Sequence, residues 1–176
     1  MKRSILLFVV IGLLIGVLVV WLIWNANRQR VEVIPVAAPQ TTAPLVEQKM
    51  YFIAVDNGGE DGELVGCNDS LVPIGRWVSS EGDIKRTIIE DLFTQHEQTY
   101  QRSGLYNPLW QSSLSVQTLE LKDGLATLTL QGTLKLDSRC DGLRAQSMLQ
   151  AALKQFEGVQ AVHITINNRP LGEIIP

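Results

Sequence analysis

The longest hydrophobic pattern in the chain is an uninterrupted apolar run from Ser4 to Trp24. It carries no charged residue, and it ends on two tryptophans, Trp21 and Trp24. About 20 apolar residues, rising about 1.5 Å each, cross the hydrocarbon of a bilayer as one helix, and indole rings favour the headgroup region. Because the run is apolar on every side rather than along one stripe, it predicts a transmembrane helix rather than a core helix.

A cleaved signal peptide is the alternative interpretation of this run. The apolar part of a signal peptide is about 7–15 residues long and leads to a small-x-small cleavage site. Here the run is longer and ends in bulky residues, and the nearest small residue, Ala26, lies between Asn25 and Asn27. The pattern therefore favours an uncleaved signal-anchor over residues 4–24, with residues 1–3 as a cytoplasmic N-terminus.

The charges that flank the run do not orient it. Two basic residues precede it and two follow it closely, so the positive-inside rule gives nearly a tie. The rest of the chain contains two cysteines, Cys67 and Cys140, which an oxidising compartment would pair. We therefore expect a single-pass protein of the cell membrane whose C-terminal domain is extracytoplasmic.

Beyond the run, proline spacing and then alternating patterns divide the chain. Pro35, Pro39 and Pro44 interrupt residues 25–49, which are rich in Ala and Thr and predict a semi-extended linker. Residues 50–172 predict one folded domain, and residues 173–176 a short tail. The expected elements are strands at 51–55, 71–78, 114–121, 125–130 and 159–166 and helices at 83–100 and 141–156.

Two details support this assignment. Pro73 limits the second strand to an edge or bulged position, because proline cannot donate to a sheet. Asp123 and Gly124 separate two alternating segments, and Asp-Gly is a strong hairpin signal because it tolerates positive φ. The order β-β-α-β-β-α-β predicts an α+β fold, a two-layer sandwich with both helices on one face of one sheet, preceded by the transmembrane helix.

The strand order also bears on the cysteines. If strands and helices alternate in direction, the loop with Cys67 and the start of the second helix at Cys140 fall at the same end of the domain. A disulfide between them is therefore geometrically reasonable and is favoured over two free thiols. A zinc site is disfavoured, because two cysteines and two scattered histidines lack the required ligand spacing.

The net charge excludes some partners. The chain has a formal charge of −3, which argues against nucleic acid and against docking onto anionic lipids or wall polymers by charge alone. Solubility is the simplest explanation of this acidity.

An ordered series of motifs resembles the GerMN domain, a module of sporulation and germination proteins and of some bacterial envelope lipoproteins. The resemblance covers about residues 50–172. Its motifs are CNDSLVPIGRWV at 67–78, DIKRTIIEDLF at 83–93, SGLYNPLWQSSLSVQTLELKDGLATLTL at 103–130 and CDGLRAQSMLQAALKQFEGVQAVHITINNRPL at 140–171. Asn168 departs from the glycine that is usual in the last turn. The resemblance implies an extracytoplasmic α/β module, similar to ring-building domains, with a scaffold or binding role and no known catalytic residues.

The residues themselves show no catalytic, cofactor or metal constellation above background. His96 is expected on a solvated helix face, and His163 alternates away from the apolar side of its strand. Hydrolase elbows, phosphate loops and zinc-protease motifs do not occur. Oxygen ligands for Ca²⁺ cluster in one loop, although the spacing fits no known calcium loop and a solvated acidic loop is favoured; they are Asp56, Glu60, Asp61, Glu63 and Asp69.

Trp77 and Trp110 are the candidate partner contacts, since exposed aromatics favour binding hot spots. For Trp110, packing back onto the sheet is the favoured alternative. The chain is therefore predicted to be a non-catalytic envelope module that tethers to the bilayer, needs no cofactor, and binds an envelope protein or wall component or assembles with itself. A wall-active hydrolase and a spacer without a ligand are the alternatives.

Overall fold

The computed structural model describes residues 16–22 and 43–175, which belong to two separate units, Met1–Thr41 and Thr42–Pro176. In the first unit, residues 16–22 are α-helical and exposed. Among the described helices, none has the length and hydropathy that crossing a membrane requires. The remainder of the predicted transmembrane segment, and most of the predicted linker, lie outside the described residues.

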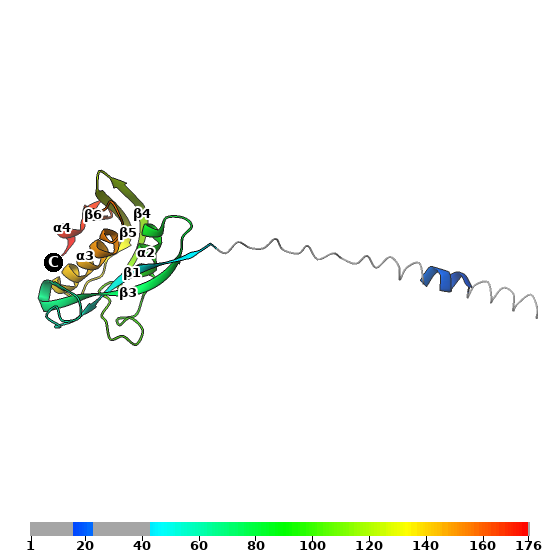
Figure 1. Ribbon diagram of the computed structural model, residues 1–176, viewed down its shortest axis with the longest axis horizontal. Coiled ribbons are helices and arrows are strands. Elements are labelled where there is room, and N and C mark those ends of the chain that lie inside the picture. The colour runs from blue at the N-terminus through cyan, green and yellow to red at the C-terminus, as the bar shows by residue number, and fades with distance from the viewer. Residues whose placement is uncertain (1–15, 23–42, 176) are drawn as a thin grey trace, which may run out of the picture. The chain divides into compact units, whose positions relative to one another are not determined.

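The first sheet of the second unit contains three antiparallel strands in the order β1-β3-β2. They are β1 (Leu45–Ala54), β2 (Glu63–Val65) and β3 (Asp69–Ser79). Figure 1 labels the two long strands of this sheet, β1 and β3. β1 begins within the segment that the sequence assigned to the linker. The cause is composition: residues such as Glu47 and Lys49 in its first half are exposed and polar, so they lack the β-branched and aromatic signal of its second half.

The second sheet has the order β4-β5-β6-β7. Its strands are β4 (Ser113–Lys122), β5 (Leu125–Thr133), β6 (Ala161–Ile166) and β7 (Arg169–Pro170). The predicted hairpin is confirmed: Asp123 and Gly124 have φ of 49° and 82°, the positive values of a type I′ turn. β5 and β6 run parallel, because a helix connects them. β7 was not predicted; it follows a turn at Asn167 and Asn168, which also have positive φ.

Three helices complete this unit: α2 (Ile84–Phe93), α3 (Arg139–Lys154) and α4 (Leu171–Ile174). Asp83 caps α2 as expected, accepting hydrogen bonds from the Lys85 and Arg86 N–H groups. The prediction that this helix continues to about Tyr100 is wrong. The amide of buried Asn107 donates to the carbonyl of Gln95 at 2.6 Å, which holds the chain in a loop just beyond the helix.

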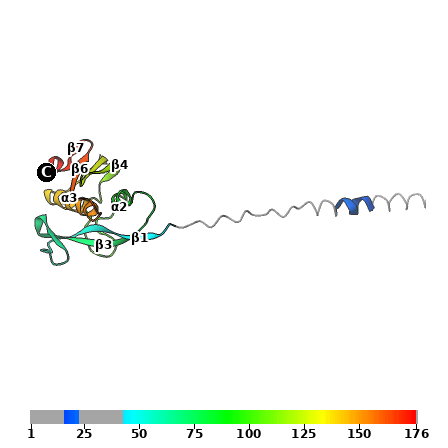
Figure 2. The same ribbon diagram turned by 45° about the horizontal axis from the view of Figure 1, so that its top comes forward.

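The layers differ from the prediction, although the α+β class holds. Instead of one sheet with both helices on one face, the helices lie between two sheets (Figure 2). α2 contacts β1, β3 and β4, and α3 contacts β1, β2 and β6. Alternation along a strand shows which side chains face the core, but it carries no information on which strands pair, and so it could not separate one sheet from two.

One hydrophobic core joins the two sheets through the helices. Its fully buried members come from every layer, and they include Met50, Phe52, Leu92, Leu128, Leu149 and Leu153. The Phe52 ring also stacks on Tyr100, with 4.2 Å between ring centroids. This packing fixes the positions of α3 and the first sheet, between which the candidate site lies.

Candidate functional site

The predicted pairing of Cys67 with Cys140 is present in the structure as a disulfide, with 5.9 Å between the Cα atoms. Cys67 lies in η1 (Gly66–Asn68), the connection between β2 and β3, and Cys140 lies in the first turn of α3. The bond therefore fastens one end of the first sheet to the start of the helix that covers it.

Beneath the disulfide lies a buried charged cluster formed by Asp69, Asp141 and Arg144. The Arg144 guanidinium donates to both carboxylate oxygens of Asp69, at 2.7 and 3.1 Å, and to Oδ1 of Asp141 at 3.0 Å. Asp69 is 0% exposed and Asp141 is 3% exposed. These hydrogen bonds, that with Asp69 foremost, raise the pKa of Arg144. The two carboxylates share one cation.

Tyr106 closes this cluster on one side. The Arg144 guanidinium carbon lies 5.4 Å from the centre of the Tyr106 ring, a cation–π distance. Burial, followed by the negative charge of Asp141, raises the pKa of Tyr106 to about 12. The phenol therefore stays protonated at ordinary pH, and the cluster serves as an internal ion-pair network that stabilises the fold.

The sequence contained a signal for this cluster that the prediction did not use. Asp69 follows Cys67 by two residues, and Asp141 directly follows Cys140. A disulfide between the two cysteines brings these two aspartates into the same region, and buried carboxylates need a partner such as a cation. Arg144, one helical turn beyond Asp141, is the residue that the spacing offers.

The acidic loop does not assemble as a calcium site would. The Asp69 carboxylate forms an ion pair with Arg144. The loop is organised by Asn57, whose side-chain oxygen accepts hydrogen bonds from the Asp61 N–H and from the Ser70 hydroxyl. Within the described residues, no three His, Cys, Asp or Glu side chains form a group that could hold a metal ion. Glu63 instead lines a groove beside α3.

The two tryptophans lie on different elements. Trp77 is on β3 and is 60% exposed, so it is available for contact. Trp110 is half-buried in the segment that leads into β4. His163 on β6 and His96, just beyond the end of α2, are both exposed.

Two grooves lie between the first sheet and α3, and the sequence predicted neither. The first groove has a volume of about 260 Å³, and the second, of about 330 Å³, continues along β1 and β3. Gln155 lines both grooves. The first groove is lined by Tyr51, Glu63, Val65, Leu71, Ser147, Gln150, Ala151, Lys154 and Gln155; the second is lined by Glu47, Gln48, Lys49, Pro73, Gly75 and Gln155.

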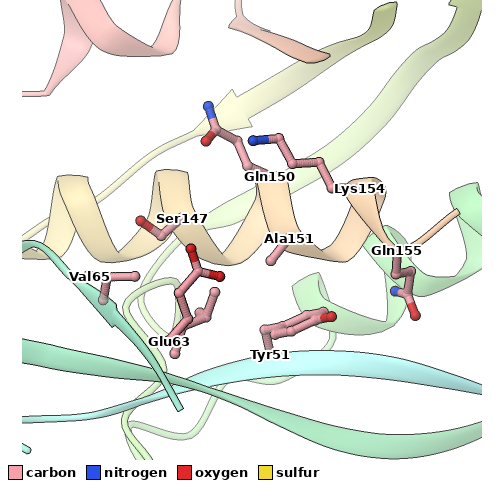
Figure 3. A pocket seen from close by; sticks show the side chains of 9 residues that line it. Tyr51, Glu63, Val65, Ser147, Gln150, Ala151, Lys154 and Gln155 are labelled. Atoms are coloured by element: carbon pink, nitrogen blue, oxygen red, sulfur yellow. The ribbon is translucent and has the colours of Figure 1, made fainter. Parts of the chain in front are cut away.

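Figure 3 shows how the first groove is built. Tyr51 and Glu63 extend from the strands toward α3, where the Glu63 carboxylate lies near Ser147, while Gln150 and Lys154 extend from α3 on the side away from the sheet. In the part of the chain that the structure describes, the side chains of Tyr51, Glu63 and Gln150 form no hydrogen bond with another residue. Burial, with a smaller contribution from Glu63, raises the pKa of Tyr51. The groove thus offers unengaged donors and acceptors above an apolar floor.

This arrangement suits ligand binding better than hydrolysis. A glycoside hydrolase of the usual kind needs a pair of carboxylates facing each other across a cleft. Glu63 is the one carboxylate among the residues that line the first groove. The other lining groups are a phenol, a hydroxyl, amides and an ammonium, which bind a polar ligand through hydrogen bonds.

Comparison with known structures shows the fold. The tandem GerMN domains of the sporulation protein GerM from Bacillus subtilis are 18% identical, with a TM-score of 0.51, over 76% of this chain and 43% of that chain. The chain thus spans less than half of that tandem structure. The first GerMN domain of the same protein is 15% identical, with a TM-score of 0.48, over 71% of this chain and 85% of that chain. A putative lipoprotein from Clostridium perfringens is also 15% identical, with a TM-score of 0.39, over 71% of this chain and 76% of that chain.

No curated protein matches the chain significantly. A family match, in contrast, covers residues 49–172, well over half of the chain. It confirms the resemblance to GerMN domains that the motifs between Cys67 and Leu171 predicted. The protein therefore belongs to the Germane family, described as sporulation and spore germination.

Proposed function

We propose that this protein is a membrane-tethered, non-catalytic module of the bacterial cell envelope that binds or assembles with other envelope components. The observation that carries the proposal is the Cys67–Cys140 disulfide in a domain that follows an apolar run. Disulfides persist in oxidising compartments. A domain held by one, behind a segment long enough to cross a bilayer, belongs on the outer side of that bilayer.

The fold supports a binding role rather than catalysis. Its buried charged groups are engaged with one another around Arg144, and its solvent-facing polar groups line grooves beside α3. The tandem GerMN domains aligned above come from a sporulation protein. In this proposal the proline-containing linker holds the domain away from the membrane, where it binds its envelope partner.

The first experiment tests the compartment. Cells that produce the full chain are quenched with acid, and their proteins are denatured and treated with a maleimide-polyethylene glycol, with or without prior reduction. The chain has two cysteines, so an extracytoplasmic domain gives no mass shift before reduction and a double shift after it. The variant Cys67→Ser should shift once under both conditions. A double shift without reduction would contradict the proposed location.

The second experiment tests the role. Cross-linking in intact cells, followed by solubilisation of the membranes and mass spectrometry, should capture an envelope partner or a second copy of the chain. A variant that lacks residues 4–24 should lose these cross-links, because it is no longer held at the membrane. Recovery of the uncross-linked monomer alone from the full chain would count against a binding or assembly role.

A further inference from the structure

We infer that the two grooves form one continuous cleft for an uncharged glycan chain. We call this surface the sheet-face cleft and define it by Tyr51, Glu63, Gln150 and Gln155 in the first groove, and by Lys49 and Gly75 in the second. The inference rests on the proposed function and deepens it, because it names the chemical class of the envelope component.

The cleft is extended rather than round. The strand register puts Tyr51 opposite Pro73, Lys49 opposite Gly75 and Glu47 opposite Trp77, so these side chains share one face of the first sheet. Gln155 is the residue that lines both grooves. Beyond the second groove, exposed Trp77 continues the same face. The surface therefore accommodates a linear ligand of several units, and not a single small molecule.

Two aromatic side chains mark the ends of this surface. Tyr51 lies in the first groove, and Trp77 lies beyond the second, four residues further along the strand direction by the register, or roughly 13 Å at about 3.3 Å per residue. Flat aromatic surfaces with a polar group, surrounded by amides and a carboxylate, match a sugar, which has apolar C–H faces and hydroxyl edges. Between the two aromatics the Glu47 side chain lies over Gly75, where an added Cβ would meet its carboxylate, so this part of the surface is polar.

The charges of the cleft balance, which decides against an ionic polymer. Glu63 and Lys154 line the first groove, and Glu47 and Lys49 line the second. Each groove is therefore lined by one carboxylate and one ammonium group. Their charges cancel at a distance, so neither groove attracts polyanions or polycations strongly. A ligand without net charge, rich in hydroxyl and amide groups, loses least on entering such a surface.

The backbone beside the cleft decides against a peptide that would extend the sheet. The Gln155 side chain accepts from the Lys49 N–H and donates to the Lys49 carbonyl, both at 2.8 Å. Further along the same edge, Tyr106 pairs with Ile53 through two backbone hydrogen bonds, at 2.7 and 3.0 Å. The edge groups of Lys49 and Ile53 that strand addition would need are thus already occupied.

The test is calorimetric titration of the purified full chain with the soluble tetramer of β-1,4-linked N-acetylglucosamine. We expect saturable binding whose dissociation constant changes less than about twofold between 0.05 and 0.5 M salt, because a neutral ligand releases no counterions. Trp77→Ala should weaken binding about threefold to tenfold, as the loss of one aromatic contact does. Glu63→Gln should weaken binding by a similar factor.

The controls are Leu125→Ala, which removes another exposed apolar side chain from the second sheet, and Glu120→Gln on β4. Both should leave the dissociation constant within about twofold, and thermal melts check that every variant is folded. Absence of binding, binding that is lost at high salt, or binding that Trp77→Ala and Glu63→Gln leave unchanged would overturn the inference. The cross-linking experiment tests the proposed function separately from glycan binding. If it captures an envelope partner while the glycan does not bind, the glycan inference fails and the proposed function stands.

Discussion

Arg144 is the residue on which the buried end of the domain depends. Its side chain is 13% exposed, and it bonds two carboxylates that are almost fully buried. Taking charges out of water is costly, and the cost is offset here by bidentate geometry and by the second acceptor, Asp141. Removal of the cation would leave two buried carboxylates facing each other.

We predict that Arg144→Met lowers the free energy of unfolding by about 3–5 kcal/mol, the usual effect of leaving buried partners uncompensated. Urea unfolding followed by circular dichroism measures the change. Arg76→Met is the matched control, since the Arg76 side chain in its ion pair with Asp91 is 51% exposed and the pair should contribute less than about 1 kcal/mol. Equal losses in the two variants would show that the buried cluster has no special role.

Tyr106 gives the fold a dependence on alkaline pH. Its pKa is raised from 10.0 to about 12 in the folded protein, so the folded state holds the phenolic proton more tightly than the unfolded state. This contribution to stability is fully present below pH 10 and is lost as the pH rises from 10 to 12. After allowance for solvent screening of a partly exposed ring, it amounts to about 1–2 kcal/mol.

We therefore predict that Tyr106→Phe flattens this part of the pH profile. Between pH 9 and pH 12, the free energy of unfolding should fall by about 1–2 kcal/mol less in the variant than in the parent chain, because phenylalanine has no proton to lose. Urea unfolding at a series of pH values measures both profiles. Parallel profiles would mean that Tyr106 ionises alike in the folded and unfolded chains.

At the scale of elements, β1 is held from both sides. β3 pairs with it along its whole length, while the Gln155 side chain from the end of α3 satisfies the N–H and carbonyl of Lys49 on the opposite edge. An unpaired strand edge invites pairing with another chain. The Gln155 side chain thus forms the two hydrogen bonds that a neighbouring strand would otherwise form with Lys49. It thereby prevents another strand from pairing with the middle of β1.

We predict that Gln155→Ala speeds hydrogen exchange at the Lys49 amide on the order of fivefold to tenfold, since one hydrogen bond contributes about 1 kcal/mol. Exchange at Ile53, which Tyr106 holds, should stay unchanged. Gln150→Ala removes an amide from the same helix that has no backbone partner in the described structure, and it is the control. A Lys49 amide that exchanges equally in both variants would show that the Gln155 bond is not formed in solution.

At the scale of the whole molecule, the disulfide joins parts of the chain that are 73 residues apart. It links the first sheet to α3, and α3 packs in turn on the second sheet through β6. Closing so long a loop removes much of the conformational freedom of the unfolded chain. The cross-link therefore acts on the cooperativity of the entire domain.

We predict that Cys67→Ser/Cys140→Ser lowers the free energy of unfolding by about 4 kcal/mol, the loop-entropy expectation for a closure of this length. Urea unfolding of the oxidised chain, the reduced chain and the double variant measures the effect. The reduced chain and the double variant should agree, since both lack the cross-link. A loss below about 1 kcal/mol would mean that residual structure already restrains the unfolded chain.

Local patterns in the sequence determined the hairpin around Asp123 and Gly124, the start of α2 at its Asp83 cap and the α+β class. Each depends on neighbouring residues, through positive φ, side-chain capping or alternation. The cysteine pairing also followed from strand direction. The family resemblance followed from the order of motifs along residues 67–171, which a linear reading can detect.

Tertiary structure decided what depends on contacts between distant segments. Which strands pair is one such property, because alternation places side chains on a face without naming the neighbouring strand. The cluster of Asp69, Asp141 and Arg144 and the grooves beside Gln155 are others, since they join distant segments, as Lys49 and Gln155 do at a separation of 106 residues. The sequence alone therefore predicted most of the longer elements and the covalent link, while packing of α3 between two sheets created the surfaces on which function is proposed.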